Sequence, residues 1–345
     1  MEEYDDIQKS KHWKKFDERK HLYNETSLEN FRNNGLSDGL DDRYSLEKQK
    51  EILDDLLAEI GEHFVYSNLT NKNIGNVREY LKVGEKIADG GQLFHIRWLH
   101  DLTEHVFSQK DVKYICEIGG GYGSFAQKVF SNVPCTYIMI DLPEANLLAS
   151  YYLSKHFSRA KILLCDEIEG KKVSKKQVQE YDFIIIPPWY ELDADVLIDL
   201  FINTRSMMEM NREAIKKYFD LIHRAIAPDG CFFNINRYSK DTVGYPIKFG
   251  EYPYDEKWSV VLSRPSWKQG HIHQLITRRT ASSGNIQEEL NRIEEISQRL
   301  LNRNQLKHIQ MKVKIVAAEA LKSILPRRIY KICKNILKRA QKYHF

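Results

Sequence analysis

An acidic residue followed by three alternating glycines is the stretch of this 345-residue sequence with the clearest chemical meaning. Glu117 lies near the end of an apolar run, and glycines follow it at every second position, Gly119, Gly121 and Gly123. Glycine allows backbone conformations with positive φ and the close approach of a ligand. We expect a helix to begin at Ser124, so that its free N–H groups face the turn. The pattern predicts a strand, a tight turn and a helix around a nucleotide-type ligand.

The spacing of the glycines distinguishes between two kinds of ligand. A dinucleotide-binding turn has the pattern G-x-G-x-x-G, whose third glycine would fall at position 124. This sequence has Ser124 there, and its turn resembles the first motif of S-adenosylmethionine (SAM)-dependent methyltransferases. The resemblance implies that Glu117 faces the amino acid end of the cofactor and that the glycines lie against its methionine and ribose. A turn with a purely structural role is the alternative.

A second acidic residue lies at the distance expected for a ribose contact. Asp141 directly follows the apolar run 136–140 and comes 20 residues after Gly121. An acid at the end of the second strand, about 20 residues beyond the turn, can accept hydrogen bonds from ribose hydroxyls. Alternatively, Asp141 is the N-cap of the helix that opens with Leu142 and Pro143. The two roles are compatible.

Apolar runs that alternate with amphipathic helices predict the fold class. Four further runs are expected to be strands: 161–165, 183–189, 197–202 and 231–236. A helix with one apolar stripe, at 212–227, precedes the last of them. This order implies an α/β fold with a Rossmann-like parallel sheet and helices on both faces. Residues 241–280 are rich in aromatic side chains and predict a closing β-hairpin. The pattern leaves open whether 183–189 or 197–202 is the fourth strand.

Composition and hydrophobic patterning predict an ordinary globular protein with helical additions at both ends. The chain is 42% apolar and 29% charged, and no apolar run approaches the roughly 20 residues of a membrane span. We expect a helical N-terminal segment at 1–85, a SAM-dependent methyltransferase domain at 86–280 and a basic helical C-terminal extension at 281–345. The N-terminal segment is expected to pack on the core or on a second subunit of a homo-oligomer.

Charge is unevenly distributed along the chain. Residues 307–345 contain eleven Lys or Arg and one acid, a net charge of +10, so the remainder carries −6 of the total of +4. An acidic body argues against a nucleic acid substrate. The basic amphipathic pattern at 329–342 suits an anionic membrane surface or an acidic partner, or else a helix that packs on its own body.

The sequence predicts a cytoplasmic protein, with peripheral contact at the inner face of the membrane as an additional expectation. The charged residues 1–15 lack the apolar core of a signal peptide. The five cysteines have no C-x-x-C spacing, and four of them lie in or beside apolar runs, as buried thiols do in a reducing compartment.

The histidines do not predict a metal site. His95 and His100 are five residues apart, which does not place two ligands on one helix face. His271 and His273 share one face of a strand, but no cysteine or third placed ligand accompanies them.

Several longer stretches resemble the sugar O-methyltransferase family of bacterial surface-polysaccharide gene clusters. They span roughly residues 85–280: EIGGGYGSFAQKVF, YIMIDLPEANLLASYYLSKHF, DLFINTRSMMEM, FFNINR and YPYDEKW. The resemblance implies SAM as methyl donor and a sugar hydroxyl as acceptor, carried by a sugar, a sugar nucleotide or a glycolipid. The basic C-terminal extension lies outside the similar region.

A sugar hydroxyl is a poor nucleophile near neutral pH, so a general base is expected. Glu209 follows the fourth strand, where many O-methyltransferases have a catalytic residue. His223 has the better intrinsic pKa but lies within a helix, beside its apolar stripe. Other polar residues are expected to contact the ligands: Asn203 the cofactor, and Ser206, Arg237 and Tyr238 the acceptor.

Two alternative functions remain open from the sequence. A nicotinamide-dependent oxidoreductase or epimerase usually needs a Tyr-x-x-x-Lys pair, which Tyr151 and Lys155 offer, but on the helix after the second strand. A non-catalytic scaffold would use the basic extension to recruit glycan enzymes to the membrane. Glu117, the glycine turn and Asp141 argue against the loss of a cofactor site.

Overall fold

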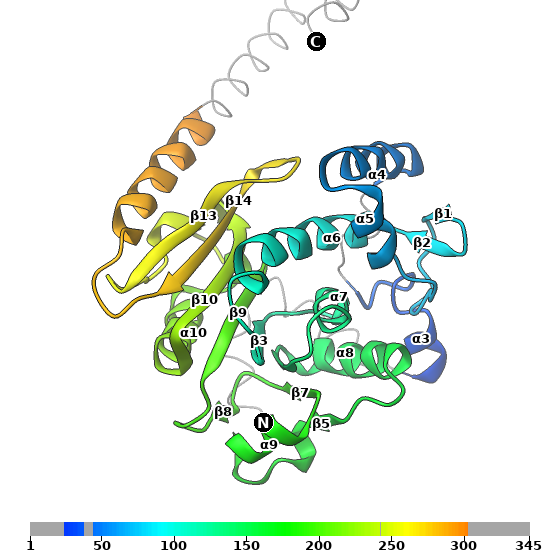
Figure 1. Ribbon diagram of the computed structural model, residues 1–345, viewed down its shortest axis with the longest axis horizontal. Helices are drawn as coiled ribbons and strands as arrows, with labels where there is room; N and C mark the ends of the chain where they lie inside the picture. The colour runs from blue at the N-terminus through cyan, green and yellow to red at the C-terminus, as the bar shows by residue number, and fades with distance from the viewer. Residues whose placement is uncertain (1–23, 38–43, 242, 303–345) are drawn as a thin grey trace, which may run out of the picture. The chain divides into compact units, whose positions relative to one another are not determined.

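The computed structural model describes residues 24–37, 44–241 and 243–302, and it contains one large mixed β-sheet (Figure 1). The described residues fall into two units, divided between Glu294 and Glu295. The strands of the large sheet, in their order across it, are β13 (Trp258–Ser266), β14 (Gln269–Arg279), β10 (Ile226–Arg237), β9 (Ile198–Thr204), β3 (Tyr114–Ile118), β4 (Thr136–Ile140), β7 (Phe183–Ile186) and β5 (Ile162–Leu164).

The sheet confirms the predicted α/β class. Strands β10, β9, β3, β4, β7 and β5 are all paired in parallel. The hairpin β13–β14 closes one side, with β14 antiparallel to β10. A dinucleotide-binding sheet places a sixth parallel strand beyond the fifth. The antiparallel β14 takes that place here, as expected for the closing hairpin.

The structure also answers the question that the sequence left open about the fourth strand. Both apolar runs belong to the sheet, on opposite sides of β3. β7 pairs with β4, whereas β9 pairs with β3 and β10. β9 therefore occupies the position of the fourth Rossmann strand, and the run at 161–165 forms the short edge strand β5.

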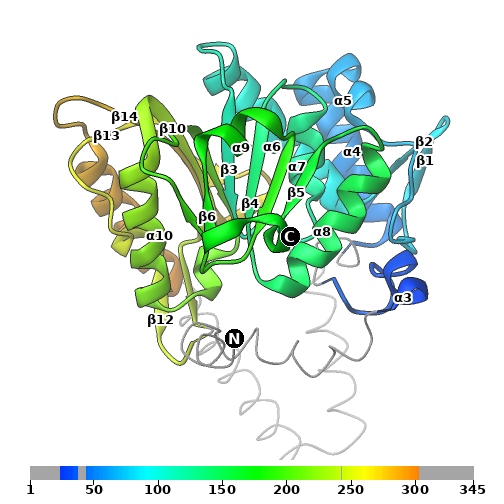
Figure 2. The ribbon, with the colours of Figure 1, turned by 90° about the horizontal axis from the view of Figure 1, so that it is seen from below.

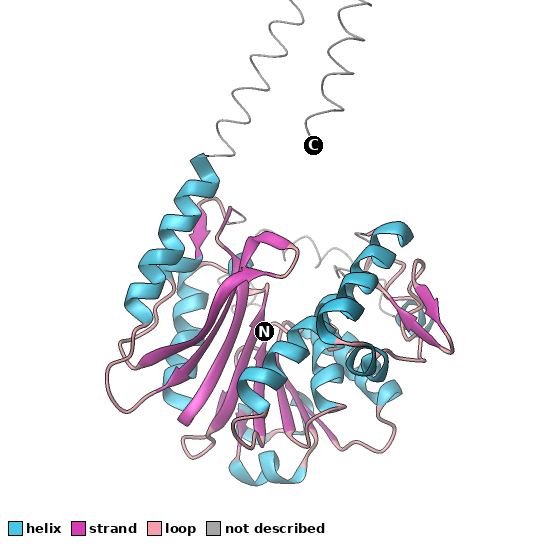
Figure 3. Cartoon of the chain, turned by 45° about the horizontal axis from the view of Figure 1, so that its top comes forward, coloured by secondary structure: helices cyan, strands magenta, loops and turns pink. Residues whose placement is uncertain are grey.

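Helices cover both faces of the sheet because alternate side chains of each buried strand point to opposite faces (Figures 2 and 3). One face packs against α6 (Gly90–Leu102), α7 (Ser124–Phe130) and α8 (Pro143–His156), with Ile115, Met139 and Ile202 in the shared core. On the other face, α10 (Arg212–Ala225) packs through Phe219, whose ring centroid lies 5.8 Å from that of Phe232. Figure 2 shows the strands between α6 and α10.

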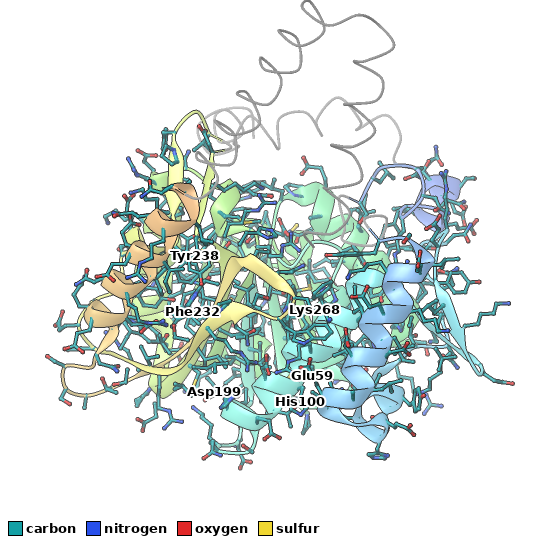
Figure 4. The ribbon with its side chains drawn as sticks, turned by 90° about the horizontal axis from the view of Figure 1, so that it is seen from above. Glu59, His100, Asp199, Phe232, Tyr238 and Lys268 are labelled. Atoms are coloured by element: carbon teal, nitrogen blue, oxygen red, sulfur yellow. The ribbon has the colours of Figure 1, made fainter. Side chains whose placement is uncertain are left out.

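The N-terminal part of the chain packs on α6 and on the tip of the closing hairpin. Its elements are α3 (Glu25–Glu29), α4 (Leu46–Ile60), α5 (Glu62–Asn68), β1 (Leu81–Val83) and β2 (Lys86–Ala88). Glu59 of α4 accepts hydrogen bonds from the Trp267 indole at 2.9 Å and from Arg97 of α6 at 3.0 Å. Figure 4 shows Glu59 close to Lys268 at the hairpin tip. The hairpin β1–β2 was not predicted, since β1 lies in the segment 1–85 that was expected to be helical and no strand was expected at 86–88.

Short elements complete the described part of the chain. They are a π-helical turn at Thr103–Phe107, 3₁₀ helices at Cys165–Glu167, Glu169–Lys171, Met207–Glu209 and Phe249–Glu251, helix α9 (Lys175–Glu180), and the paired strands β6 (Lys172–Val173) with β8 (Glu191–Leu192) and β11 (Ser239–Asp241) with β12 (Pro246–Lys248).

A helix begins at residue 286 and is described as far as residue 302. The basic pattern at 329–342 lies outside the described residues. Among the described helices, none is long and apolar enough to cross a membrane. The domain boundaries at 85 and 280 stay predictions.

Candidate functional site

The carboxyl ends of the parallel strands bring most of the predicted site residues to one edge of the sheet, here called the carboxyl edge. Because β3, β4, β9 and β10 run in the same direction, the residues that follow them lie along this edge. They include Gly119 after β3, Asp141 after β4 and Arg205 after β9. Helix α6 also reaches this region, since its His95 Nδ1 lies 3.1 Å from Oγ of Ser124, the first residue of α7.

The three glycines of the turn all have positive φ, but they serve different purposes. At Gly119 (φ 75°) a Cβ would lie 2.0 Å from Ser206 Oγ, so packing within the protein demands glycine there. At Gly123 (φ 84°) a Cβ would lie 3.2 Å from Leu153. At Gly121 (φ 57°) a Cβ would meet no atom within 4 Å. Gly121 is therefore the position where the turn leaves room for a ligand.

Glu117 presents a buried carboxylate beneath this turn. Its side chain is 1% exposed, and Oε2 accepts a hydrogen bond of 2.9 Å from the Tyr137 hydroxyl. Oε1 is buried and has no hydrogen-bond partner of acceptable geometry among the described residues. Burial raises the pKa of Glu117 to about 7; the hydroxyls of Tyr137 and Thr204 oppose the rise, and the charge of Asp141 adds to it. A cationic ligand group would donate a hydrogen bond to the free Oε1 atom of Glu117 and neutralise the charge of its carboxylate.

Asp141 holds the turn from the neighbouring strand. Its Oδ2 accepts from Gly121 N at 2.7 Å and its Oδ1 from Leu142 N at 2.7 Å. Burial raises the pKa of Asp141 to about 6, although these two N–H groups lower it. A carboxylate has about four acceptor sites, so ribose hydroxyls can still bond to it. The N-cap of α8 is Leu142, so the alternative role of Asp141 as the cap itself is wrong.

Asn203 and Ser206 lie at the carboxyl edge but bond to the protein itself. Asn203 is fully buried; its Nδ2 donates to Ile118 O at 2.7 Å and to Ser206 Oγ at 2.6 Å. Its Oδ1 accepts from Met207 N and from Asn236 Nδ2, at 3.3 and 2.8 Å. Ser206 Oγ donates to the Ile118 carbonyl at 3.1 Å. The predicted contacts of Asn203 with the cofactor and of Ser206 with the acceptor are therefore corrected: both fix the end of β9 to the end of β3.

Glu209 lies at the same edge and forms an ion pair. It ends the 3₁₀ helix Met207–Glu209, its side chain is 15% exposed, and Oε1 accepts a short hydrogen bond from Lys240 Nζ. The charge of Glu209 contributes to the raised pKa of Asp141, which places the two carboxylates in one electrostatic environment. The ion pair with Lys240 fixes the position of the Glu209 carboxylate at the carboxyl edge.

The two residues predicted to bind the acceptor after β10 differ in accessibility. Arg237 is half-buried, and its Nε has no hydrogen-bond partner among the described residues. Tyr238 is almost fully buried, and its hydroxyl lies 3.0 Å from Nδ1 of the buried His273. The prediction for Tyr238 is corrected, because its hydroxyl is used within the fold.

His223 lies away from the candidate site. It is in the last turn of α10, just before the amino end of β10, and therefore near the opposite edge of the sheet. Its surroundings are Asp255, with Nε2 to Oδ2 at 4.0 Å, and the rings of Phe219 and Trp258. Burial lowers the pKa of His223. The prediction of His223 as a base is wrong, because periodicity alone does not tell which end of a helix reaches the ligand.

Three residues near the turn were missed by the sequence analysis. Tyr137 donates to Glu117, and its position within an apolar strand gave no signal. Gln92, in the first turn of α6, is 1% exposed, and neither end of its amide has a partner among the described residues. His95, considered in the sequence only as a metal ligand, lies beside the turn; burial lowers its pKa to about 3, and the charge of Arg205 contributes, so its imidazole is neutral.

Metal ligands do not gather in the described part of the chain. Among residues 24–37, 44–241 and 243–302, no three His, Cys, Asp or Glu side chains form a group that could hold an ion. The cysteines described there, Cys116, Cys135, Cys165 and Cys231, are all free thiols.

Comparisons with known proteins give weak likenesses of fold. No protein family and no curated protein sequence matches the chain. Solved structures with similar folds include the mitomycin 7-O-methyltransferase MmcR, with 16% identity, a TM-score of 0.35 and coverage of 55% of this chain and 57% of that one. An O-methyltransferase family 2 protein from Planctomyces limnophilus in complex with apigenin has 13% identity, a TM-score of 0.34 and coverage of 55% and 67%.

A third similar structure is the N-methyltransferase NodS from Bradyrhizobium japonicum, with 15% identity, a TM-score of 0.33 and coverage of 54% of this chain and 97% of that one. Two of these proteins are named as O-methyltransferases and one as an N-methyltransferase. At these TM-scores the likenesses carry no functional argument, so the site must be interpreted from its own residues.

Proposed function

We propose that this protein is a SAM-dependent O-methyltransferase that acts on a sugar hydroxyl. The observation that carries the proposal is the buried Glu117 carboxylate, with one free oxygen, beneath a glycine turn that lacks the third glycine of a dinucleotide site. The antiparallel strand β14 beyond β10 supports the same class of fold and argues against a dinucleotide-binding sheet.

The residues around the turn fit SAM. Glu117 has the charge and the free acceptor for the ammonium group of the methionine part, Gly121 leaves space, and Asp141 accepts from ribose hydroxyls. Bound SAM supplies an electrophilic methyl group on its sulfonium. Transfer is then an in-line displacement, for which the protein mainly has to align the acceptor hydroxyl.

Glu209 is the proposed general base. Its carboxylate takes the proton of the acceptor hydroxyl as the new oxygen–methyl bond forms and the sulfur–methyl bond breaks. The contact with Lys240 keeps the carboxylate of Glu209 in position. His95 is a poorer candidate, because a group with a pKa near 3 accepts a proton only weakly at neutral pH.

Positive charge at the carboxyl edge supports an acceptor that carries an anionic group. Burial is the main cause of the lowered pKa of His271, and the charges of Arg237 and Arg205 lower it further, so these three residues lie near one another. Arginine side chains suit phosphate and carboxylate oxygens. A sugar nucleotide or an acidic sugar therefore fits better than a neutral monosaccharide. The sugar itself rests on the sequence resemblance.

Calorimetric titration with S-adenosylhomocysteine, with NADH as a parallel ligand, tests the proposal. We expect binding of S-adenosylhomocysteine alone, and much weaker binding by Glu117→Gln. Glu144→Gln on α8 is the control for loss of a carboxylate near the same edge. Binding of NADH alone would overturn the proposed cofactor and restore the oxidoreductase alternative, and binding of neither compound would favour the scaffold.

A further inference from the structure

A cavity outside the proposed cofactor and acceptor site is lined by three lysines. It has a volume of about 530 Å³ and lies between the end of α5, strand β2 and the C-terminal halves of α7 and α8. Lys72, Lys86 and Lys128 line it, and its lining includes no aspartate or glutamate. We call it the lysine cavity. None of the residues assigned above to cofactor or acceptor belongs to it.

Lys128 is the most unusual of the three lysines. It is 1% exposed, and its Nζ donates a hydrogen bond of 2.7 Å to the carbonyl of Asn68. An ammonium group has three N–H donors, so a single neutral acceptor leaves it poorly compensated. Burial lowers the pKa of Lys128 to about 8. The charge of Asp89 opposes this shift, but Asp89 is already paired with Arg32 at 2.8 Å.

The other two lysines also bond to main-chain carbonyls. Lys72 Nζ lies 2.9 Å from the carbonyls of Lys155 and His156, at the end of α8. Lys86 Nζ lies 2.6 Å from the carbonyl of Tyr66, near the end of α5. Such contacts stabilise helix C-termini. Among the described residues, however, none of the three lysines forms an ion pair with a carboxylate.

The three positive charges lie close enough to affect neighbouring groups. The charge of Lys86 lowers the pKa of Lys128, and the charges of Lys72 and Lys128 lower the pKa of His156. Burial is the main cause of the pKa of about 3 at His156, whose imidazole is therefore neutral. Its Nε2 and the Oε1 of Gln127, which is 8% exposed, have no hydrogen-bond partner among the described residues.

We propose that the lysine cavity binds the phosphate group of a small phosphate ester. Ammonium donors without a carboxylate partner favour an oxyanion, and lysine is a common point charge for phosphate. A volume of about 530 Å³ lies in the range of small-molecule sites, so the ligand is larger than phosphate itself. The free Gln127 oxygen and the His156 nitrogen suit ligand hydroxyls. This site is independent of the proposed methyl transfer.

The test measures binding to the full-length protein, saturated with S-adenosylhomocysteine, by calorimetry. The probes are inorganic phosphate, inorganic pyrophosphate and glucose 1-phosphate, with sodium chloride at equal ionic strength as a control. We expect glucose 1-phosphate to bind more tightly than inorganic phosphate. Lys72→Gln and Lys86→Gln should each weaken binding at least tenfold, because each removes one of three charges. No heat with any phosphate probe at about 10 mM would overturn the proposal.

The control variant is Lys82→Gln. Lys82 is an exposed residue of β1, on the same hairpin as Lys86, and it does not line the cavity. Lys82→Gln should leave phosphate binding unchanged. If Lys82→Gln and Lys86→Gln lose the same amount of affinity for phosphate, the effect is due to surface charge in general, and the proposal is overturned. Binding of S-adenosylhomocysteine should be the same in all three variants, so failure of this site and failure of the cofactor site are distinguishable.

Two further measurements complete the test. Lys128→Met removes the buried charge at similar volume and should abolish binding; if this variant does not fold, the Lys72 and Lys86 variants decide. Vesicles containing phosphatidic acid test a lipid as the source of the phosphate. Sedimentation that Lys86→Gln reduces but Lys82→Gln does not would assign a lipid head group to the cavity, whereas equal sedimentation of both variants would exclude that source.

Discussion

Glu117 occupies a position that costs stability at neutral pH. Its pKa is raised from 4.5 to about 7, so the folded protein binds its proton more tightly than the unfolded chain does. The contribution of Glu117 to stability is therefore greatest below pH 4.5 and falls as pH rises towards 7, where the buried group must ionise. Gln can still accept from Tyr137 and carries no charge. We expect Glu117→Gln to stabilise the protein at pH 8, by roughly 3 kcal/mol at most, as measured by urea unfolding.

The same residue should make cofactor binding depend on pH. If the Glu117 carboxylate binds the ammonium group of the ligand, protonation weakens binding below the pKa of about 7. The apparent affinity for S-adenosylhomocysteine should fall about tenfold between pH 8 and pH 6, and this slope should disappear in Glu117→Gln. A parallel slope in wild type and variant would assign the pH dependence to another group, such as Asp141.

Glu209 is the residue on which the proposed chemistry depends. We expect Glu209→Gln to lower kcat by about 10²- to 10⁴-fold, the usual contribution of a general base. Binding of S-adenosylhomocysteine should be unchanged, because Glu209 has no proposed contact with the cofactor. The control is Glu213→Gln, an exposed position in the first turn of α10. A kcat within twofold of wild type in Glu209→Gln would exclude Glu209 as the base.

At the scale of elements, the glycines of the turn have different roles: Gly119 is required for packing within the protein, whereas Gly121 leaves space for a ligand. Gly119→Ala puts a Cβ 2.0 Å from Ser206 Oγ, in a polar network that joins β9 to β3. Gly121→Ala meets open space, and its cost is that of a left-handed residue, about 1–2 kcal/mol. We expect urea unfolding to show that Gly119→Ala lowers the free energy of unfolding at least twice as much as Gly121→Ala does.

Cofactor binding should show a different pattern in these two variants. In Gly121→Ala the new methyl group occupies the space left for the ligand, so S-adenosylhomocysteine should bind more weakly than the small loss of stability would suggest. If Gly121→Ala binds S-adenosylhomocysteine as wild type does, the open space at this position is not part of the cofactor site.

The difference between Asp141 and Asn203 shows how far sequence patterns predict this site. The strand order and an acid at the end of β3 and directly after β4 leave a regular spacing, so Glu117, the glycines and Asp141 could be located from the sequence. Asn203 near the end of β9 and Ser206 just after it form an equally suitable polar pattern, yet both bond to the Ile118 carbonyl. Whether a polar group faces a ligand or another strand depends on contacts between residues that are 85 positions apart in the sequence. The local spacing of residue types does not contain this information.

Other features depended on long-range packing in the same way. The periodicity of α10 was correct, but His223 proved to be at the end away from the carboxyl edge. The lysine cavity joins residues from α5, β2, α7 and α8, and none of its lysines belongs to a local motif. Both strand candidates at 183–189 and 197–202 were real, and only the pairing could tell which lies beside β3.

At the scale of the whole molecule, the uneven charge suggests where the protein acts. Residues 307–345 carry +10 and the rest of the chain −6. These 39 residues lie outside the described part of the structure. Anionic membrane surfaces attract basic segments by about 1 kcal/mol per lysine or arginine. We propose that the extension holds the protein at such a surface, where glycolipid acceptors are found.

Sedimentation with vesicles tests this proposal. The full-length protein should bind vesicles rich in phosphatidylserine at low salt, release them at about 0.5 M salt, where the Debye length is only a few ångströms, and ignore neutral vesicles. Replacing Lys331, Lys334 and Lys338 with Glu should weaken binding at least 100-fold, about 3 kcal/mol for the three positive charges removed. The same change of net charge at Lys161, Lys175 and Lys176, exposed positions of the body, should have a much smaller effect. If both triple variants lose binding equally, total charge governs the attraction and the extension is not a specific membrane anchor.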